Sequence, residues 1–312
     1  MNAAYMIEKK TISFANSIIN TSVMIFILLL VVIGCYAIWD SDQVFQTANS
    51  ARYEIYKPTI EDEGKSFEEL QAINSDIFGW LTVYGTHIDY PVVQGFDNIH
   101  YVNYNAEGEY SLSGSIFLDV ACNCEFSDFN SIIYGHHMEK QAMFGEIGCF
   151  NEKSYFDDHK YGMIYCDGKE HGLEFFAIVH ADAYDGNVFK TRITKRKDRQ
   201  AYIDMLLDRA IYFRDVQITA DDNIILLSTC SASSTNGRDI LAARITDEIY
   251  VDAFKTKEPE NTIINRILTV DGLAGIWPQV SLWTNIFFIG LLFFQRTRFN
   301  KKYRHVISYE RR

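Results

Sequence analysis

The sequence predicts a mainly β fold, a closed barrel with inserted helices, flanked by two apolar stretches. Eight short apolar segments bounded by Gly, Asp or Asn are typical of strands, whereas only two segments have the spacing of amphipathic helices. The strands follow one another too closely for a helix between every pair, which argues against a doubly wound parallel sheet. A mixed or antiparallel barrel suits so many short strands better.

The first apolar stretch predicts a transmembrane helix over residues 18–39. Residues 11–39 contain no charged side chain, and the segment can cross a hydrocarbon core of about 30 Å at about 1.5 Å per residue. A cleaved signal peptide, a lipoprotein signal that ends at Cys35 and a buried core helix are the alternatives. The apolar run exceeds the roughly 7–15 residues of a signal sequence, and no A-x-A-like site follows, which favours an uncleaved anchor.

The second apolar stretch predicts another transmembrane helix over residues 273–294. It is interrupted by Pro278 and leads into a basic tail, residues 295–312, that holds seven Lys and Arg and one Glu. Because Lys and Arg stay on the cytoplasmic side of a membrane, we expect both termini inside the cell and the middle of the chain outside. An interfacial helix resting on the membrane surface is the alternative for this stretch.

Charge separates the middle of the chain from its ends. The formal net charge is −12, and −19 remains between the apolar stretches once the +6 of the C-terminal tail and the +1 of the N-terminal tail are set aside. Such an acidic domain argues against nucleic-acid binding and suits cationic or neutral partners. The predicted order is a cytoplasmic N-terminus (1–17), a span (18–39), an extracellular linker with a first helix (40–69), the main domain (70–255), a juxtamembrane linker (256–272), a second span (273–294) and a cytoplasmic tail (295–312).

Periodicity predicts the elements of the domain. Residues 67–73 have helical spacing, and residues 198–213 place Tyr202, Leu206 and Ala210 on one face with charges between them, as an amphipathic helix requires. The eight predicted strands are residues 80–83, 88–93, 115–118, 131–134, 162–166, 173–180, 223–227 and 240–245.

The spacing of the six cysteines shows no dense disulfide framework. Cys122 and Cys124 precede His136 and His137 and so suggest zinc. Structural zinc sites usually have two closely spaced cysteine pairs, however, and this chain has one irregular pair. We therefore predict no metal and no cofactor.

Cys230 is the candidate nucleophile. It ends the apolar segment 224–229 and precedes a polar loop, so its thiol stands at a strand edge. A thiol is a weak nucleophile until it ionises, and a cationic neighbour such as Arg238, just past the loop, favours the thiolate. His136 follows another apolar strand and Gly135, so the two strand ends can meet and the imidazole can serve as acid or base.

These residues resemble the active-site motifs of the sortase family. Residues 227–230 (LSTC) match the T-L-x-T-C signature except that Leu226 replaces its first Thr, residues 134–136 (YGH) match the histidine strand, and residues 237–238 (GR) match the arginine strand, in the family's order. Class B is indicated by residues 79–81 (GWL), 88–95 (IDYPVVQG), 97–98 (DN) and 114–119 (GSIFLD), and by the helical insert before the cysteine strand.

The resemblance implies an eight-stranded sortase barrel and a transpeptidase that cleaves a C-terminal sorting signal after its Thr. Cys230 would attack the Thr carbonyl, a protonated His136 would donate to the leaving nitrogen, and Arg238 would bind the oxyanion. Plain packing is the alternative for each groove residue, above all for Val102 and Leu227. The groove residues implied by the resemblance are Asn98, Val102, Tyr134, Leu227, Ser228 and Thr229.

The implied partners are surface proteins with an NPxTN-like or LPxTG-like sorting signal, an amine acceptor such as the lipid II peptide or a pilin lysine, and the membrane of a Gram-positive bacterium. The class B pattern favours the NPxTN-like signal and a cell-wall acceptor. Ser231, where an acidic residue is common, and the second span depart from class B. The second span resembles pilus-building sortases, so a pilin-polymerising enzyme stays open.

An L,D-transpeptidase and an inactive barrel suit the sequence less well. An L,D-transpeptidase would need an S-H-G-C-like run with His and Cys close together, which this sequence lacks. An inactive membrane-tethered barrel that binds or scaffolds is the alternative outside the enzymes, and the intact Cys, His and Arg argue against it.

Overall fold

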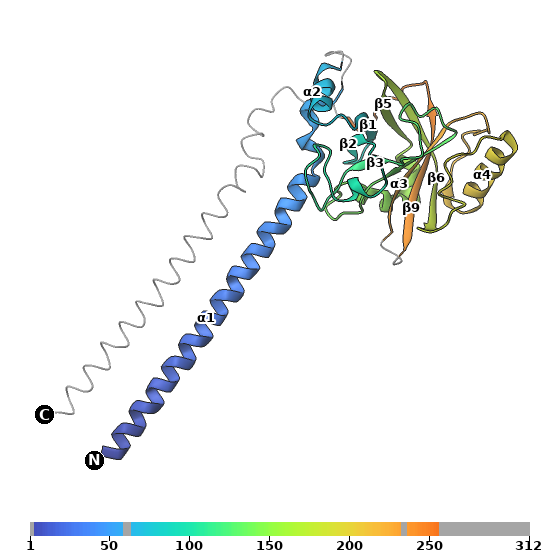
Figure 1. The fold of residues 1–312 in the computed structure, drawn as a ribbon. Helices are drawn as coiled ribbons and strands as arrows, with labels where there is room; N and C mark the ends of the chain where they lie inside the picture. Colours follow the sequence, from blue (N-terminus) through green and yellow to red (C-terminus); the bar gives the residue numbers. More distant parts are fainter. Residues whose placement is uncertain (1–2, 59–63, 232–235, 256–312) are drawn as a thin grey trace. The chain divides into compact units, whose positions relative to one another are not determined.

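Eight strands close into a barrel (Figure 1). The computed structural model describes residues 3–58, 64–231 and 236–255. In these residues one sheet has the order β5-β1-β2-β3-β4-β8-β9-β6-β7, and β5 also pairs with β6, so eight strands close and β7 stays at the edge. The strands are β1 (Ile77–Val83), β2 (Asp89–Val93), β3 (Ile116–Leu118), β4 (Asn130–Tyr134), β5 (Tyr161–Cys166), β6 (Lys169–Asp182), β7 (Ala210–Phe213), β8 (Ile224–Cys230) and β9 (Gly237–Thr246). The predicted closed barrel is confirmed, and the eight predicted strands are its eight barrel strands.

Helices lie before the barrel and in its connections. The predicted helix over residues 67–73 is found as α2, which begins slightly earlier, at Lys65. The helices are α1 (Ala3–Ala48), α2 (Lys65–Ile73), α3 (Lys153–Asp158) and α4 (Arg196–Asp208), with short 3-10 helices η1 (Ser50–Arg52), η2 (Glu54–Tyr56), η3 (His100–Val102) and η4 (Gly145–Asn151).

The prediction of one helix over residues 198–213 is wrong at its C-terminal end. The helix α4 ends at Asp208, and Ala210–Phe213 forms β7, which pairs antiparallel with β6. The side chains of β7 alternate between partly buried and exposed, which is the period of a strand with one face covered. Ile211, Tyr212 and Phe213 favour an extended backbone, and the free edge of β6 supplies the hydrogen bonds.

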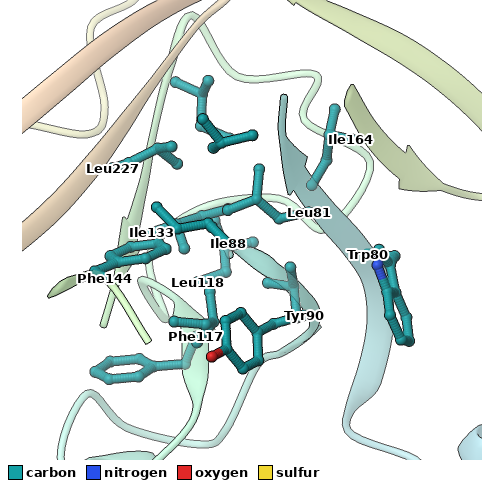
Figure 2. Packing of buried hydrophobic residues seen from close by; sticks show 14 of the residues in the cluster. Trp80, Leu81, Ile88, Tyr90, Phe117, Leu118, Ile133, Phe144, Ile164 and Leu227 are labelled. Carbon is teal, nitrogen blue, oxygen red and sulfur yellow. The ribbon is translucent and has the colours of Figure 1, made fainter. Parts of the chain in front are cut away.

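The strand β8 is covered on both faces, which explains its continuous apolar run. Leu227 belongs to the cluster inside the barrel together with Leu81 and Ile133 (Figure 2). Leu226 belongs to a second cluster outside the barrel, which includes Leu206 of α4. Alternating side chains thus fill two cores, and burying each large apolar side chain contributes about 1.5–3 kcal/mol.

The helix α1 contains a candidate membrane span. Residues Lys10–Ala48 are long and apolar enough to cross a membrane, and none of their most apolar window is buried. The predicted span over residues 18–39 lies inside this range. The predicted second span (273–294), with residues 256–272 and 295–312, lies outside the described residues.

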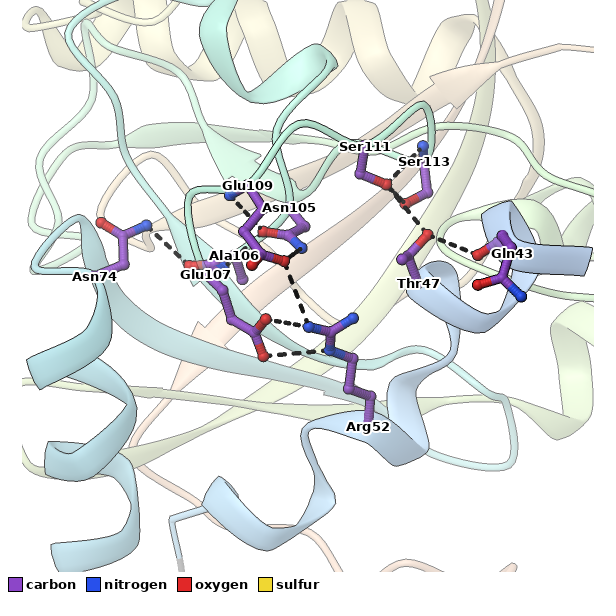
Figure 3. Close-up of polar contacts among 10 residues, drawn as sticks. All are labelled: Gln43, Thr47, Arg52, Asn74, Asn105, Ala106, Glu107, Glu109, Ser111 and Ser113. Carbon is purple, nitrogen blue, oxygen red and sulfur yellow. Dashed lines mark hydrogen bonds and ion pairs between the residues drawn. The ribbon is translucent and has the colours of Figure 1, made fainter. Parts of the chain in front are cut away.

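The C-terminal end of α1 is attached to the barrel rather than followed by a free linker. Ala48 is fully buried, and Ser111 Oγ donates to Thr47 Oγ1 at 3.2 Å (Figure 3). Just after α1, the guanidinium of Arg52 pairs with the carboxylate of Glu107. The C-terminal end of the apolar helix is therefore held against the barrel domain.

Candidate active site

Two parallel strands end side by side at one end of the barrel. In the pairing of β4 with β8, Tyr134 lies opposite Ser228, and the backbone N–H of Gly135 still donates to the Ser228 carbonyl at 3.2 Å. His136 and Cys230 follow two residues further along their strands. Because the register of a parallel pair advances equally on both strands, His136 and Cys230 reach the same edge of the barrel, as predicted.

Arg238 contacts the Cys230 thiol directly. The antiparallel pairing of β8 with β9 sets the two residues opposite each other. Arg238 Nη1 donates to Cys230 Sγ at 3.1 Å and to the Gly237 carbonyl at 3.2 Å. Within the described residues, Arg238 forms no ion pair with a carboxylate, and its neighbour Asp239 is paired instead with His180 Nδ1 at 3.1 Å. The positive charge of Arg238 is thus directed at an exposed sulfur.

A backbone carbonyl orients His136. The His136 Nε2 atom lies 2.8 Å from the Val102 carbonyl oxygen. Since a carbonyl can only accept, Nε2 carries its hydrogen, and Nδ1 is the nitrogen left to exchange a proton. Gly114 allows this arrangement, because it has φ +59° and a Cβ there would lie 2.6 Å from the same Val102 oxygen.

Val102 therefore has a role that the sequence did not predict. Its side chain is partly buried and packs on the barrel core, while its backbone holds His136.

Two other predicted groove residues, Asn98 and Tyr134, meet at a third residue. Both donate hydrogen bonds to the carboxylate of Asp119, which is 7% exposed. Sequence reasoning missed Asp119 as a site residue, although it follows the apolar segment of β3 just as Cys230 ends that of β8. A polar residue at the end of an apolar strand was the available signal.

Leu227, Ser228 and Thr229 are buried in this structure. Leu227 has no exposed surface and packs inside the barrel. The hydroxyl groups of Ser228 and Thr229, residues that are 1% and 2% exposed, have no hydrogen-bond partner in the described part of the chain. Here the three residues form the strand that carries Cys230, and Leu227 offers no surface to a peptide.

Burial makes the other four thiols of the domain harder to ionise than a free thiol. Burial raises the pKa of Cys166 to about 11 and that of Cys122 to about 12. Burial also raises the pKa of Cys124 and Cys149. In residues 3–58, 64–231 and 236–255, no three His, Cys, Asp or Glu side chains gather so that they could hold a metal ion.

A large cavity lies away from these groups. It measures about 820 Å³ and is lined by Phe67 and Glu68 of α2, Phe78 at the start of β1, Tyr165 near the end of β5, and Cys124. Following the ladder from β8 through β9 and β6 to β5, the β5–β6 turn lies at the barrel end opposite Cys230. The cavity therefore does not contain the candidate active site.

An exposed thiol that accepts a hydrogen bond from a guanidinium, at the same rim of a closed barrel as an imidazole, is the arrangement of an enzyme with a cysteine nucleophile. No family model matches the chain. It is 33% identical to Sortase B of Staphylococcus aureus over 207 residues, which cover 65% of this chain and 81% of the relative. The chain belongs to the sortase family, as a sortase B-like cysteine transpeptidase.

Solved structures agree with this membership. Sortase B from the type II pilus of Streptococcus pneumoniae is 46% identical with a TM-score of 0.52, and the match covers 58% of this chain and 99% of that one. A Streptococcus pyogenes class B sortase involved in pilus biogenesis is 40% identical with a TM-score of 0.53, covering 59% of this chain and 99% of that one.

Proposed function

We propose that this chain is a membrane-anchored sortase that cleaves a C-terminal sorting signal after Thr and transfers the acyl group to an amine of a cell-wall precursor. The observation that carries the proposal is the contact of Arg238 Nη1 with Cys230 Sγ at 3.1 Å. The same guanidinium can then stabilise negative charge on the sulfur before attack and on the substrate oxygen after it.

The proposed reaction has two acyl transfers. Cys230 Sγ attacks the Thr carbonyl carbon, the Arg238 guanidinium stabilises the resulting oxyanion, and His136 Nδ1 gives a proton to the leaving nitrogen as the C–N bond breaks. An amine then attacks the thioester, loses a proton to His136 and releases the thiolate. Because the oxyanion exists only in the tetrahedral state, a fixed donor there typically contributes about 10²–10³ in rate.

The proposed topology follows from the apolar stretches. The helix α1 anchors the chain, the acidic domain lies outside a Gram-positive cell, and residues 273–294 return the chain so that both termini are cytoplasmic. External protease on intact cells should then digest the domain and leave a tag after Arg312 intact. Digestion of that tag would contradict the second span.

The proposed signal is NPxTN-like, from the class B pattern of the sequence. A sortase B structure solved as a complex with triglycine, 32% identical with a TM-score of 0.54, supports an amine acceptor of this peptide type. The test is the full-length chain in detergent with NPxTN-like, LPxTG-like and SPxTG-like peptides plus triglycine, with products identified by mass spectrometry. A tenfold preference needs only about 1.4 kcal/mol.

A preference for the LPxTG-like peptide would overturn the class B specificity and leave the chemistry standing. Absence of cleavage of every peptide would favour the binding or scaffold barrel instead.

A pilin-polymerising sortase is the second candidate, and its support is the sequence identity to sortases of pilus assembly. The two structures of pilus sortases are 46% and 40% identical to this chain, against 33% for S. aureus Sortase B. The acceptor would then be a lysine of a pilin subunit. Offering triglycine and a pilin-type lysine peptide together, and measuring which amine enters the product, separates the two functions.

A further inference from the structure

We infer that Asp119 is a positioning residue that determines which hydrogen-bond donors and acceptors the peptide groove presents. The inference rests on the proposed function, because it concerns how the sorting signal is held beside Cys230. Asp119 is not itself expected to touch the reacting atoms.

The carboxylate of Asp119 joins side chains from separate parts of the chain. Its Oδ2 atom accepts from Asn98 Nδ2 at 2.9 Å and from the Tyr134 hydroxyl at 3.0 Å. Its Oδ1 atom accepts from the backbone N–H of Ala121 at 2.8 Å, while Asn98 Oδ1 accepts from the backbone N–H of Val120 at 2.8 Å. Asp119 is therefore a buried carboxylate whose two oxygens are both hydrogen-bonded.

The cluster lies next to the reacting groups. Tyr134 ends β4 and stands two residues before His136, and it lies opposite Ser228, two residues before Cys230. Since residues two apart on a strand share a face, the Tyr134 side chain follows the row that leads to His136 and Cys230. A peptide that reaches the thiol along this face passes Tyr134.

Asp119 decides what Tyr134 and Asn98 can offer to such a peptide. The Tyr134 hydroxyl has one hydrogen, which it gives to Asp119, so it can only accept from a ligand. Burial, followed by the negative charge of Asp119, raises the pKa of Tyr134, which keeps that hydrogen in place. Asn98 has its oxygen occupied and keeps one amide hydrogen to donate. The two side chains therefore present one acceptor and one donor, the complement of a peptide N–H and C=O.

The test is Asp119→Asn in the full-length chain, with initial rates on the sorting-signal peptide that the wild type cleaves best. The amide keeps the size but has one oxygen, so at least one of its contacts is lost and the charge that orients Tyr134 disappears. We expect KM to rise about tenfold and kcat to stay within about twofold, since a charged hydrogen bond of this kind typically accounts for such a factor. The matched control is Asp128→Asn, which removes a carboxylate from the same loop, where Asp128 Oδ2 accepts from the backbone N–H of Asn123. It should leave KM unchanged.

A second measurement separates positioning from general destabilisation. If Asp119 acts through Tyr134, then Asp119→Asn should cost much less in a Tyr134→Phe background than in the wild type. Tyr134→Phe alone, which keeps Asp119, should raise KM and leave the alkylation rate of Cys230 unchanged.

An unchanged KM in Asp119→Asn, a fall in kcat alone, or additive effects in the double variant would overturn the inference. If Asp119→Asn does not fold, an unchanged KM in Tyr134→Phe would overturn it. If the wild type cleaves no sorting signal, the proposed function fails first, so the two failures are distinguishable.

Discussion

The two ends of the barrel differ in what they contain. At one end the strands β4, β8 and β9 deliver His136, Cys230 and Arg238 to the surface, with the sulfur 3.1 Å from a guanidinium nitrogen. At the other end lies a cavity of about 820 Å³ whose lining includes Glu68, Glu125, Asp167 and Glu170. The cavity is lined by none of His136, Cys230 and Arg238, which lie at the opposite end.

The difference teaches that register, rather than volume, locates the chemistry. The strand β8 pairs in parallel with β4 and antiparallel with β9, and these two registers determine which residues lie near Cys230. Near the cavity, burial raises the pKa of Cys124 and Cys166.

The largest expected effect is the loss of activity in Cys230→Ala. The thiol supplies the attacking atom and little packing volume, since it is exposed at the end of β8. We expect peptide cleavage to fall at least about 10⁴-fold, by analogy with the removal of other catalytic nucleophiles, with an unchanged melting temperature. Cys124→Ala at the cavity end is the control and should keep its rate. Turnover by the Cys230→Ala enzyme would reassign the nucleophile.

The next largest expected effect is a difference in the alkylation rates of Cys230 and Cys166 in the folded protein. At pH 8, a thiol with a pKa of about 11, as for Cys166, is only about 0.1% thiolate. We expect iodoacetamide to modify Cys230 at least about 10² times faster than Cys166, as measured by peptide mapping over time. Because burial raises the Cys166 pKa, its thiolate fraction should grow about tenfold per pH unit up to that value. Equal modification rates at pH 8 would show that burial does not suppress the reaction of Cys166.

Arg238→Lys should reduce kcat/KM more than about tenfold. An ammonium keeps the charge but lacks the rigid plane of the guanidinium, whose Nη1 donates to both the Gly237 carbonyl and the sulfur. The control is Arg244→Lys, because Arg244 pairs with Ile224 at the far end of β8 and forms an ion pair with Glu174. Near-normal activity of Arg238→Lys would move oxyanion binding to another donor.

Two glycines with positive φ give the smallest contrast. Gly114 has φ +59° and a Cβ there would lie 2.6 Å from the Val102 oxygen, whereas Gly168 at the far end has φ +72° and open space around it. Both Ala variants should lose about 1–2 kcal/mol of stability from the left-handed backbone, and Gly114→Ala should lose more because its Cβ meets backbone atoms of Tyr101 and Val102. Only Gly114→Ala should also lower kcat, by about three- to tenfold, because the carbonyl that orients His136 must move. Equal kcat values for the two variants, measured beside their melting curves, would remove that role from Val102.

Much of the fold could be predicted because barrel strands leave a local pattern. The segment 224–227 is apolar at every position since both faces of β8 are covered, and that pattern needs no knowledge of the partners. The helix over 198–213 was predicted too long for the complementary reason. Residues 210–213 have no strand signature long enough to compete with the preceding helix, and the edge of β6 decided their conformation.

The sequence by itself determined the eight barrel strands and the apolar helix, and it predicted His136, Cys230 and Arg238 as the active-site residues, because each of these features depends on residues that lie close together in the sequence. Only the tertiary structure decided that the Val102 carbonyl holds His136, that Asp119 joins Asn98 to Tyr134, and that Leu227 faces the core. These contacts join residues 15–34 positions apart. Their existence depends on how strands pair and which face turns inward, and a one-residue change of register would reverse every face.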